Sequence, residues 1–351
     1  MQKRYWILLL PLVLLLTACS AQQKVITGNT FALDTLIELK LYDYPNQYRD
    51  TLIQDAFDEI SQLEKTLSMH IAGSDIDNIN KDAGVKPTKV SDLTYRVLQD
   101  SLFFSEKTGG LFDVTAGPLI DLWAIDPPDG HYPSQSELDA VLPLIDYHKI
   151  SFLGDNTIEL DDKGMIVNLG AIAKGTIANE VKTYLLSRGV TSALINLGGN
   201  VLAVGSKPDG SSFVIGIQDP ESPRGNYLFS IKVDDESVVS SGDYERYFVY
   251  NGKIYHHILN PKTGFPADTN IKQVTIVTAN SQTADGLSTS VLLLGVKKGI
   301  QLVESLDGVE AILITKDHYV YFTEGLRGRY EVEPELIKNY TITQNLSDLK
   351  N

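Results

Sequence analysis

The sequence predicts an α+β fold, a single large domain of mixed sheets with packed helices. Apolar residues recur at helical spacing over residues 52–67, and a second helical pattern begins near Ser91 and stops at Gly109. Between residues 213 and 258, short apolar runs bounded by turn residues predict several strands in succession. Because helices and strands do not alternate regularly, the pattern does not indicate a doubly wound parallel sheet.

The remaining elements follow from the same kinds of pattern. Asn251-Gly252 is typical of a tight hairpin, and Pro261 with Gly264 predicts the next loop. The other predicted elements, in chain order, are a loop at 126–130, a strand from 165 that leads into a helix ending before 189, a short strand within 193–204, strands at 213–218, 228–233, 237–240 and 246–258, helices at 283–294 and 297–306, and a final hairpin near 316–317.

Residues 1–18 predict a signal peptide that is not part of the folded domain. Two basic residues precede an apolar run that is short for a membrane span. Leu16-Thr17-Ala18-Cys19 resembles the bacterial lipobox, in which the cysteine is lipidated and becomes the new N-terminus. Cys19 is the only cysteine of the chain, so no disulfide can form within it and lipid attachment is its predicted role. An ordinary signal peptide or a short anchor is the alternative.

We therefore expect four segments: a lipoprotein signal peptide at 1–18, the lipidated cysteine and a polar tether at 19–29, the domain at 30–340, and a C-terminal tail at 341–351. The mature protein would then be anchored by lipid to the cell membrane and face outward, in an extracytoplasmic or periplasmic space. One acyl chain holds a protein only marginally, whereas two give stable anchoring.

The composition limits the ligands that the domain can hold. A hydrophobic fraction of 43% is enough for a sizeable core, and the formal net charge is −15. An acidic surface repels phosphate backbones, so the sequence argues against nucleic-acid binding. An anionic ligand would need local cations or a metal ion to hold it.

Residues 283–294, TADGLSTSVLLL, contain a candidate metal site. On a helix, Asp285 and Thr289 lie on one face one turn apart, where they offer two hard oxygen ligands to a cation such as Mg²⁺. The structural alternative is an acid near the helix start and a threonine that bonds back to a carbonyl. On spacing alone this alternative is the stronger one, because two ligands do not make a site.

Residues 168–175, NLGAIAKG, form a glycine-bounded turn with Lys174 at the start of a helix. Exposed N–H groups and this lysine could hold a phosphate, and the carbonyl of Ala171 could supply a third metal oxygen. A structural glycine turn explains the pattern equally well. Further upstream, Asp113 lies among apolar residues, where it could accept hydrogen bonds from a ligand's ring nitrogens or cap a turn.

The stretch from Ser240 to Pro266 combines turns, an arginine between aromatic residues, and the adjacent histidines His256 and His257. If residues 255–258 are extended, neighbouring side chains face opposite ways. The two histidines therefore cannot form a metal pair. At most one of them acts in chemistry, and the other lies at the surface or serves packing.

Five motifs occur in the order and approximate spacing of one family: FDVTAGP, NLGAIAKG, SGDYERYF, HHILNPKTGFP and TADGLSTSVLLLG. From about Thr30 to the final hairpin, the chain resembles the ApbE family, the FAD:protein FMN transferases. Many members of this family are exported lipoproteins, which agrees with the lipobox.

The resemblance implies a magnesium ion held by the carbonyl of Ala171, by Asp285 and by Thr289. His257 matches the histidine of the family's SHIIDPxTG stretch and becomes the candidate base, with Asp285 as the alternative base. The positions at which the family contacts or borders FAD correspond here to Leu33, His70, Leu111, Phe112, Asp113, Asn168, Lys174 and Ile258.

Three places depart from the family pattern. Asn260 stands where an aspartate is usual, which removes a charge but keeps an acceptor. Leu33 and Asp34 replace the methionine and glycine of the family's N-terminal MGT. His70 occupies a position that is often tyrosine, which bears on water exclusion and on the balance between transfer and hydrolysis.

The activity implied by the resemblance is Mg²⁺-dependent transfer of FMN from FAD to a serine or threonine hydroxyl of an exported or membrane-bound partner protein, with release of AMP. Two other functions are open. One is an FAD pyrophosphatase, in which water replaces the hydroxyl. The other is a non-catalytic lipoprotein that binds a flavin or another solute.

Overall fold

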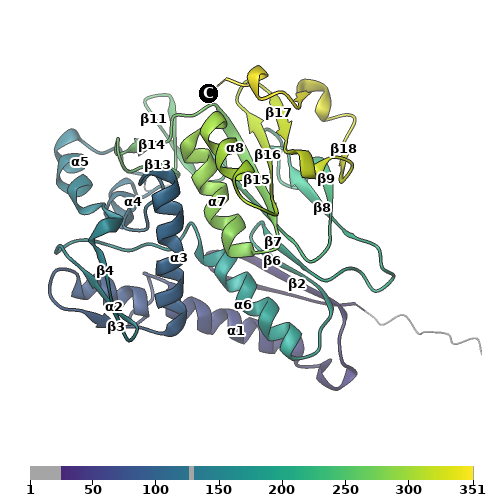
Figure 1. Ribbon diagram of the computed structural model, residues 1–351, viewed down its shortest axis with the longest axis horizontal. Helices are drawn as coiled ribbons and strands as arrows, with labels where there is room; N and C mark the ends of the chain where they lie inside the picture. The colour runs from purple at the N-terminus through teal and green to yellow at the C-terminus, as the bar shows by residue number, and fades with distance from the viewer. Residues whose placement is uncertain (1–24, 126–129, 351) are drawn as a thin grey trace, which may run out of the picture.

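The computed structural model describes residues 25–125 and 130–350, and within them a nine-stranded sheet forms the centre of the molecule (Figure 1). Neighbouring strands run antiparallel except for the last pair, which is parallel. The order across the sheet is β1 (Ile26–Ala32), β2 (Thr35–Asp43), β6 (Ser192–Leu197), β7 (Asn200–Val204), β10 (Ser237–Gly242), β15 (Ile271–Thr278), β16 (Val309–Thr315), β17 (Tyr319–Phe322) and β19 (Thr341–Thr343).

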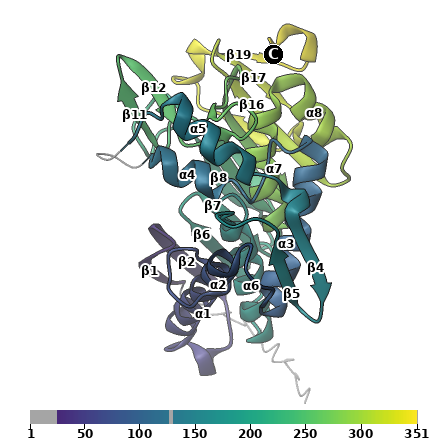
Figure 2. The same cartoon turned by 90° about the vertical axis from the view of Figure 1, so that its left-hand side faces the viewer.

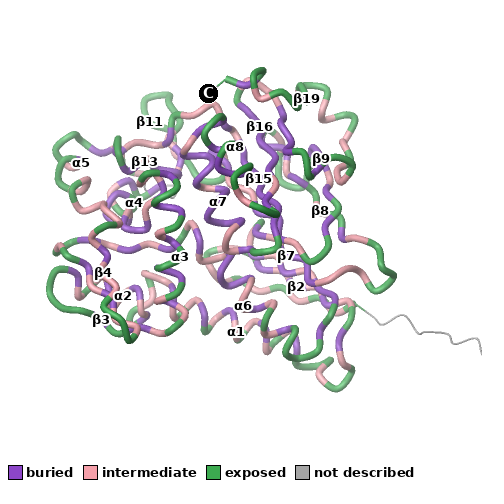
Figure 3. Tube along the Cα trace, viewed as in Figure 1, coloured by how far each residue is buried: buried purple, intermediate pink, exposed green. Residues whose placement is uncertain are grey.

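Helices cover one face of this sheet. α7 (Ser281–Leu294) lies against β10 and β15, α8 (Val296–Glu304) against β16, and α6 (Ala173–Ser187) against β6 and β7. α6 and α7 pack against each other, while α1 (Leu52–Leu67) packs on α6 and α3 (Asp92–Thr108) packs on α7. Aliphatic side chains buried between these helices and the sheet form the main core, which is the buried interior of Figure 3.

A small antiparallel sheet covers the opposite face. It consists of β18 (Tyr330–Val332), β9 (Tyr227–Val233) and β8 (Phe213–Gln218). Phe229 of the small sheet and Val277 of the large sheet belong to a second core between the two sheets. The molecule therefore has three layers: helices, large sheet and small sheet.

A further group of elements lies beside α3, on the left of Figure 1. A small core around Trp123 joins α4 (Gly117–Trp123), α5 (Gln135–Val141), the ribbon of β11 (Tyr247–Tyr250) and β12 (Lys253–His256), and the hairpin of β13 (Leu259–Asn260) and β14 (Phe265–Pro266). Below it are α2 (Asp75–Asp82) and a sheet of β3 (Thr88–Lys89), β5 (Thr157–Leu160) and β4 (Ile150–Gly154). In the turned view the β11–β12 ribbon stands at one edge of the molecule (Figure 2).

The α+β class with mixed sheets is confirmed, and local signals set the ends of several elements. α3 begins after Ser91, whose side chain accepts a hydrogen bond from the Thr94 N–H, and it ends at Gly109, which has a φ of 59°. Asn251 and Gly252, with φ angles of 49° and 75°, join β11 to β12 as predicted. The helices predicted at 283–294 and 297–306 correspond to α7 and α8.

The strand predicted ahead of α6 is wrong. Val167 and Leu169 are buried, as in a strand, but the segment makes only one isolated bridge, between Ala116 and Ile166. The Asn80 side chain satisfies the backbone instead, because it donates to the Val167 carbonyl and accepts from the Val167 N–H. Alternating burial therefore arises here without a ladder of strand hydrogen bonds.

Both ends of the described chain extend the large sheet. β1 begins at Ile26, within the segment expected to be a tether, and β19 lies within the segment expected to be a tail. The hairpin predicted near Lys316 joins β16 to β17, and the chain then continues into β18 and β19. The predicted signal peptide and Cys19 lie outside the described residues. Among the residues that are described, no helix combines the length and the apolar character needed to cross a membrane.

Candidate active site

The start of α6 lies directly against α7, and this contact brings two of the sequence motifs together. A side chain at Gly175 would collide with the backbone oxygen of Ser281 and with Asp285, so the approach requires glycine. Similarly, a Cβ added at Gly286 would lie 2.6 Å from the ring of Phe104 on α3. The two glycines allow this close packing, which positions Asp285.

Asp285 is buried at this crossing, where it is only 5% exposed. Its Oδ2 accepts a hydrogen bond of 2.8 Å from the Gly175 N–H. Burial raises the pKa of the Asp285 carboxyl, and the Lys174 cation and the nearby backbone N–H groups oppose that rise. A buried carboxylate needs a cation to be stable as an anion, so this position favours a bound positive charge.

The donors predicted for a metal ion lie around Asp285. Thr289 is half-buried one turn further along α7, and Ala171 lies in the turn just ahead of α6. Carboxylate, hydroxyl and carbonyl oxygens are hard donors, and together with the buried charge they fit Mg²⁺. Within the described part of the chain, no group of three or more His, Cys, Asp or Glu side chains could hold a metal ion. A metal ion at α7 would therefore use this mixed donor set.

Lys174 links Asp285 electrostatically to His257. Its cation opposes the rise in the pKa of Asp285 and also contributes to lowering the pKa of His257. Asn200 fixes the lysine backbone, because its amide nitrogen lies 3.4 Å from the Lys174 carbonyl and 3.1 Å from the Ser281 hydroxyl. Sequence reasoning missed Asn200, whose only signal was its place at the end of the NLGGN turn.

His257 follows the end of β12 and is half-buried. Its Nδ1 lies 3.2 Å from the Arg246 carbonyl oxygen, so Nδ1 carries the proton and Nε2 keeps its lone pair. Burial, followed by the Arg246 guanidinium, lowers the pKa of His257 to about 3. The side chain is therefore a neutral imidazole at neutral pH, with the lone pair on Nε2. Arg246 received no role from the sequence, where its only signal was its place between aromatic residues.

His256 contacts different partners and has a structural role. Its Nε2 lies 3.1 Å from the Ala267 carbonyl oxygen, and its Nδ1 accepts a hydrogen bond of 3.3 Å from the Ile258 N–H. One donor and one acceptor thus use both ring nitrogens, and burial lowers the pKa of His256. The two histidines face different surroundings, as predicted, but residues 255–258 are not a continuous strand, because β12 ends at His256.

Asn168 lies where three predicted segments meet. Its N–H donates a hydrogen bond of 2.7 Å to the Val114 carbonyl, which ties its turn to the loop after α3. Its side-chain amide lies 3.0 Å from the sulfur of Met69 at the end of α1. His70, the next residue, is exposed and acts on Asp121 of α4, whose pKa is raised by burial and lowered in part by His70.

Asp113 holds the loop that follows α3. Its Oδ1 accepts hydrogen bonds of 2.8 and 2.7 Å from the N–H and hydroxyl of Thr115, and its Oδ2 accepts one of 3.0 Å from the Tyr147 N–H. Burial raises the pKa of Asp113, and these hydrogen bonds oppose the rise. Asp113 therefore has the capping role that the sequence indicated as the structural alternative. A carboxylate oxygen has two acceptor positions, so Oδ2 has capacity for a ligand as well.

Two of the predicted FAD contacts have side chains inside the protein. Phe112 is 2% exposed, and its ring centroid lies 5.4 Å from that of Phe104. Ile258 is also buried in the main core, whereas Leu111 is half-buried. In this conformation Phe112 and Ile258 can meet a ligand only through their backbone atoms.

Leu33 and Asp34 form the turn between β1 and β2. Both have left-handed φ angles, 54° and 55°, which are uncommon for leucine and better tolerated by aspartate. The Glu64 carboxylate holds the turn against α1 by accepting a hydrogen bond of 2.9 Å from the Leu33 N–H. Leu33 thus lies near the end of α1 that leads to His70, which the resemblance places beside the same ligand.

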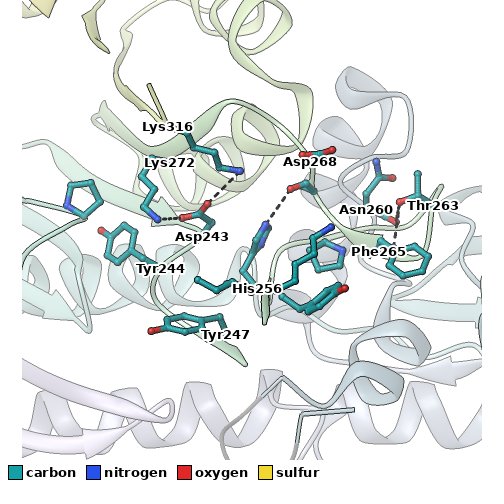
Figure 4. Close-up of a pocket in the computed structure, with 16 residues that line it drawn as sticks. Asp243, Tyr244, Tyr247, His256, Asn260, Thr263, Phe265, Asp268, Lys272 and Lys316 are labelled. Atoms are coloured by element: carbon teal, nitrogen blue, oxygen red, sulfur yellow. Dashed lines mark hydrogen bonds and ion pairs between the residues drawn. The ribbon is translucent and has the colours of Figure 1, made fainter. Parts of the chain in front are cut away.

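A cavity of about 770 Å³ lies apart from these residues, beside the β11–β12 ribbon (Figure 4). Of the described residues predicted to contact FAD or a metal ion, none lines this cavity. The candidate active site is the group of Asp285, Lys174 and His257, because a buried carboxyl and a half-buried imidazole, both with perturbed pKa values, are influenced there by one cation.

Comparisons with known proteins identify the family of the chain. The sequence model of the ApbE family matches residues 33–313. The chain belongs to the ApbE family. The FAD:protein FMN transferase of Treponema pallidum (strain Nichols) is 33% identical over 313 residues, which cover 85% of this chain and 86% of that protein. The FAD:protein FMN transferase of Klebsiella pneumoniae (strain 342) is 32% identical, with 88% of this chain and 95% of that protein covered.

Solved ApbE structures share the fold. The ApbE protein of Thermotoga maritima has a TM-score of 0.80 and 27% identity, over 87% of this chain and 99% of that one. The flavin transferase ApbE of Vibrio cholerae has a TM-score of 0.77 and 26% identity, with the same coverage of 87% and 99%. The predicted family and its single-domain α+β fold are therefore confirmed.

Proposed function

We propose that this protein transfers FMN from FAD to a serine or threonine hydroxyl of a partner protein and releases AMP. The ApbE relatives with which it shares most of its length are FAD:protein FMN transferases. The observation that carries the proposal is the hydrogen bond between Asp285 and the Gly175 N–H, which brings two separate motifs together beside Lys174. The charge of Lys174 also acts on His257, from a third motif. A neutral base, a cation and a buried carboxylate are groups that phosphoryl transfer uses.

A magnesium ion would be held by Asp285, Thr289 and the carbonyl of Ala171. When bound, it supplies positive charge to the pyrophosphate, whose negative charge shifts onto AMP as the bond breaks. The buried charge of Asp285 supports this assignment, because a cation compensates it. The Gly175 N–H orients the carboxylate by donating a hydrogen bond to its Oδ2.

The residues of the chain itself supply positioning and proton transfer. The Lys174 ammonium binds the pyrophosphate, while the N–H groups of residues 172–176 at the start of α6 are satisfied by Leu169, Ile172 and Asp285. The acceptor hydroxyl oxygen attacks the phosphorus of the FMN phosphate, the bond from that phosphorus to the bridging oxygen breaks, and this oxygen leaves with AMP. The hydroxyl proton passes to Nε2 of His257. Asp285 is the alternative base, although a metal-bound carboxylate is a weak one.

Bound FAD strengthens the base. In the free protein, burial and the Arg246 guanidinium lower the pKa of His257 to about 3, and Lys174 adds to this effect. The negative pyrophosphate, bound beside Lys174, offsets these cations and raises the pKa of His257 toward the working range. His257 is therefore a stronger proton acceptor with the substrate in place than in the free protein.

We also propose that Cys19 carries a lipid anchor and that the domain faces outward from the membrane. The support is the Leu16-Thr17-Ala18-Cys19 stretch after a basic and apolar start. An exported enzyme would modify exported or membrane-bound acceptors. Cys19→Ala should release the protein from the membrane or leave the precursor uncleaved, as fractionation and intact mass would show. Unchanged size together with full membrane retention would contradict lipid anchoring.

One incubation separates the proposed activity from its two alternatives. The protein is mixed with FAD, Mg²⁺ and a membrane extract from source cells that lack its gene. Covalent flavin on an extract protein, with an equal amount of AMP, supports transfer. Free FMN plus AMP without labelled protein indicates an FAD pyrophosphatase, and intact FAD indicates a non-catalytic binding protein. The Asp285→Asn variant in the same extract measures any background reaction.

A further inference from the structure

The β11–β12 ribbon has two apolar faces, and only one of them is packed. On the packed face, the ring centroid of Tyr255 lies 5.6 Å from that of Trp123 and 5.8 Å from that of Phe248. On the other face, the cross-strand partners Val249 and Ile254 are 60% and 55% exposed. Exposed apolar side chains gathered on one face mark an interaction site more often than scattered ones do.

The exposed face continues into the cavity of about 770 Å³ (Figure 4). Tyr247 and Ile254 of the ribbon line this cavity, and Phe265 of β14 adds another ring. We call the ribbon face and the cavity together the ribbon surface, represented by Tyr247, Val249, Ile254, Phe265 and Lys253. It offers aromatic and aliphatic contacts in a concave setting, as protein-binding sites do.

The charges of the ribbon surface favour an acidic partner. Three lysines, Lys253, Lys272 and Lys316, line the cavity against two aspartates, Asp243 and Asp268, although the chain as a whole has a net charge of −15. Lys272 and Lys316 lie 2.9 and 3.5 Å from the carboxylate of Asp243, which holds both ammonium groups in place. A local positive excess on an acidic protein attracts negatively charged chains.

The ribbon surface lies one residue away from the candidate base. His256 lines the cavity, while His257 interacts with the Arg246 carbonyl and, electrostatically, with Lys174. None of the described residues that the resemblance assigns to FAD lines the cavity. A chain bound along the ribbon would therefore lie next to the backbone that carries His257, although the two histidine side chains face different surroundings.

We propose that the ribbon surface binds the acceptor protein, through an extended segment with acidic and aliphatic residues beside the modified serine or threonine. The inference rests on the proposed transferase activity, because only that activity requires a protein substrate. An extended segment suits this surface, since a peptide can add a strand to a two-stranded ribbon. Its aliphatic side chains would cover Val249 and Ile254. Its carboxylates would meet Lys253 and the group of Lys272, Asp243 and Lys316, which carries one net positive charge.

The test compares one ribbon variant with a matched control. Ile254→Asp places a charge at an exposed position of the ribbon surface, and Val214→Asp does the same at a 52% exposed position on β8, outside the cavity. The acceptor is the protein that the parental enzyme labels in the membrane extract, purified in its unmodified form. We expect Ile254→Asp to raise the acceptor KM by about tenfold or more, with FAD affinity and kcat little changed. Val214→Asp should behave like the parent.

Two further variants separate the loss of a specific contact from a folding defect. Ile254→Thr keeps a β-branched side chain, so it should fold normally and raise the acceptor KM by a smaller factor. Lys253→Glu should raise the acceptor KM and weaken its dependence on salt. Thermal unfolding of each variant checks that the fold is intact.

Three outcomes would overturn the inference. Parental acceptor KM in both Ile254 variants would exclude the ribbon from binding, and equal losses in the Ile254 and Val214 variants would show a non-specific charge effect. A parallel loss of FAD affinity in Ile254→Asp would assign the ribbon to the FAD site instead. If the parental protein labels nothing in the extract, the transferase proposal fails first and this inference fails with it.

Discussion

The α6–α7 crossing and the β11–β12 ribbon would serve one reaction, yet they differ in almost every physical respect. At the crossing, Gly175 brings two helices into contact and Asp285 is buried against a backbone N–H. On the ribbon, Val249 and Ile254 are open to solvent beside a cavity. Chemistry needs groups held in a dry, fixed geometry, whereas recognition of a protein needs an accessible surface. The contrast implies that changes at the crossing affect catalysis and that changes on the ribbon affect acceptor binding.

The largest effect is expected at Asp285. Asp285→Asn keeps the shape of the side chain and an acceptor for the Gly175 N–H but removes the charge that would hold a metal ion. Transfer should fall by roughly several hundredfold, the scale of losing one preorganised electrostatic group, and Mg²⁺ should no longer raise the melting temperature.

The same substitution should have the opposite effect on metal-free stability. Burial raises the pKa of Asp285, so the folded state prefers the protonated form, and ionisation at neutral pH destabilises it. Asp285→Asn should therefore unfold at a higher temperature than the parent in EDTA at pH 7. Parental transfer in low magnesium, or a parental response of the melting temperature to Mg²⁺, would argue against a metal ion at this position.

The next largest effect is expected at His257. His257→Gln removes the base and should slow transfer by about a hundredfold, while FAD affinity is kept because Lys174 and the metal donors hold the dinucleotide. His256→Ala is the matched comparison, since it removes the hydrogen bonds of the ring to Ile258 and Ala267 and should lower the melting temperature, although the direct backbone bond between Ala267 and Ile258 remains. Calorimetric FAD titration and single-turnover transfer separate these effects. If His257→Gln lost FAD affinity in proportion to the transfer rate, His257 would contact FAD and would not act as the base.

A smaller effect, on the free energy of unfolding, distinguishes the close packing of the α6–α7 crossing from the open β11–β12 ribbon. Gly175→Ala forces a methyl group against the Ser281 backbone and should cost about 1–3 kcal/mol of unfolding free energy. Val249→Ala removes exposed atoms from the ribbon and should change stability by less than about 0.5 kcal/mol. Denaturant unfolding measures both. Equal costs would remove the contrast between a close-packed crossing and an open ribbon.

The smallest effect is a difference between two pH profiles. In the free protein the pKa of His257 is about 3, so this residue gives no acid limb in kcat/KM for FAD above about pH 4. In the FAD complex the pyrophosphate raises this pKa, and kcat should fall as pH falls because a protonated imidazole cannot accept the hydroxyl proton. The acid limb in kcat should disappear in His257→Gln. Its persistence there would assign the limb to another group.

Local signals in the sequence predicted much of the fold. Ser91 and Gly109 mark the ends of α3, and Asn251-Gly252 marks the ribbon turn, because caps and tight turns depend on a few neighbouring residues. The strand predicted just ahead of α6 was wrong, because the Asn80 side chain, distant in the sequence, makes hydrogen bonds with the backbone of Val167 there. A contact between residues so far apart in the chain cannot be predicted from the apolar pattern of one segment.

The candidate site was predictable only in part for the same reason. The spacing of Asp285 and Thr289 favoured a structural interpretation, and the order of the five motifs was needed to suggest a site. Asn200 and Arg246 act through contacts that the fold creates, on Lys174 and His257 respectively, so no nearby sequence signal assigned their roles. The ribbon surface was also missed, because its exposed face depends on which side packs against the core.

The measurement that tests the division of roles most directly is steady-state transfer to the purified acceptor by His257→Gln and Ile254→Asp, with kcat and acceptor KM determined for each. We predict that His257→Gln lowers kcat by about a hundredfold with the acceptor KM within about threefold of the parent. We predict that Ile254→Asp raises the acceptor KM by about tenfold with kcat near the parental value. If both variants change the same parameter, chemistry and acceptor binding are not divided between His257 and the ribbon surface, and the account is wrong.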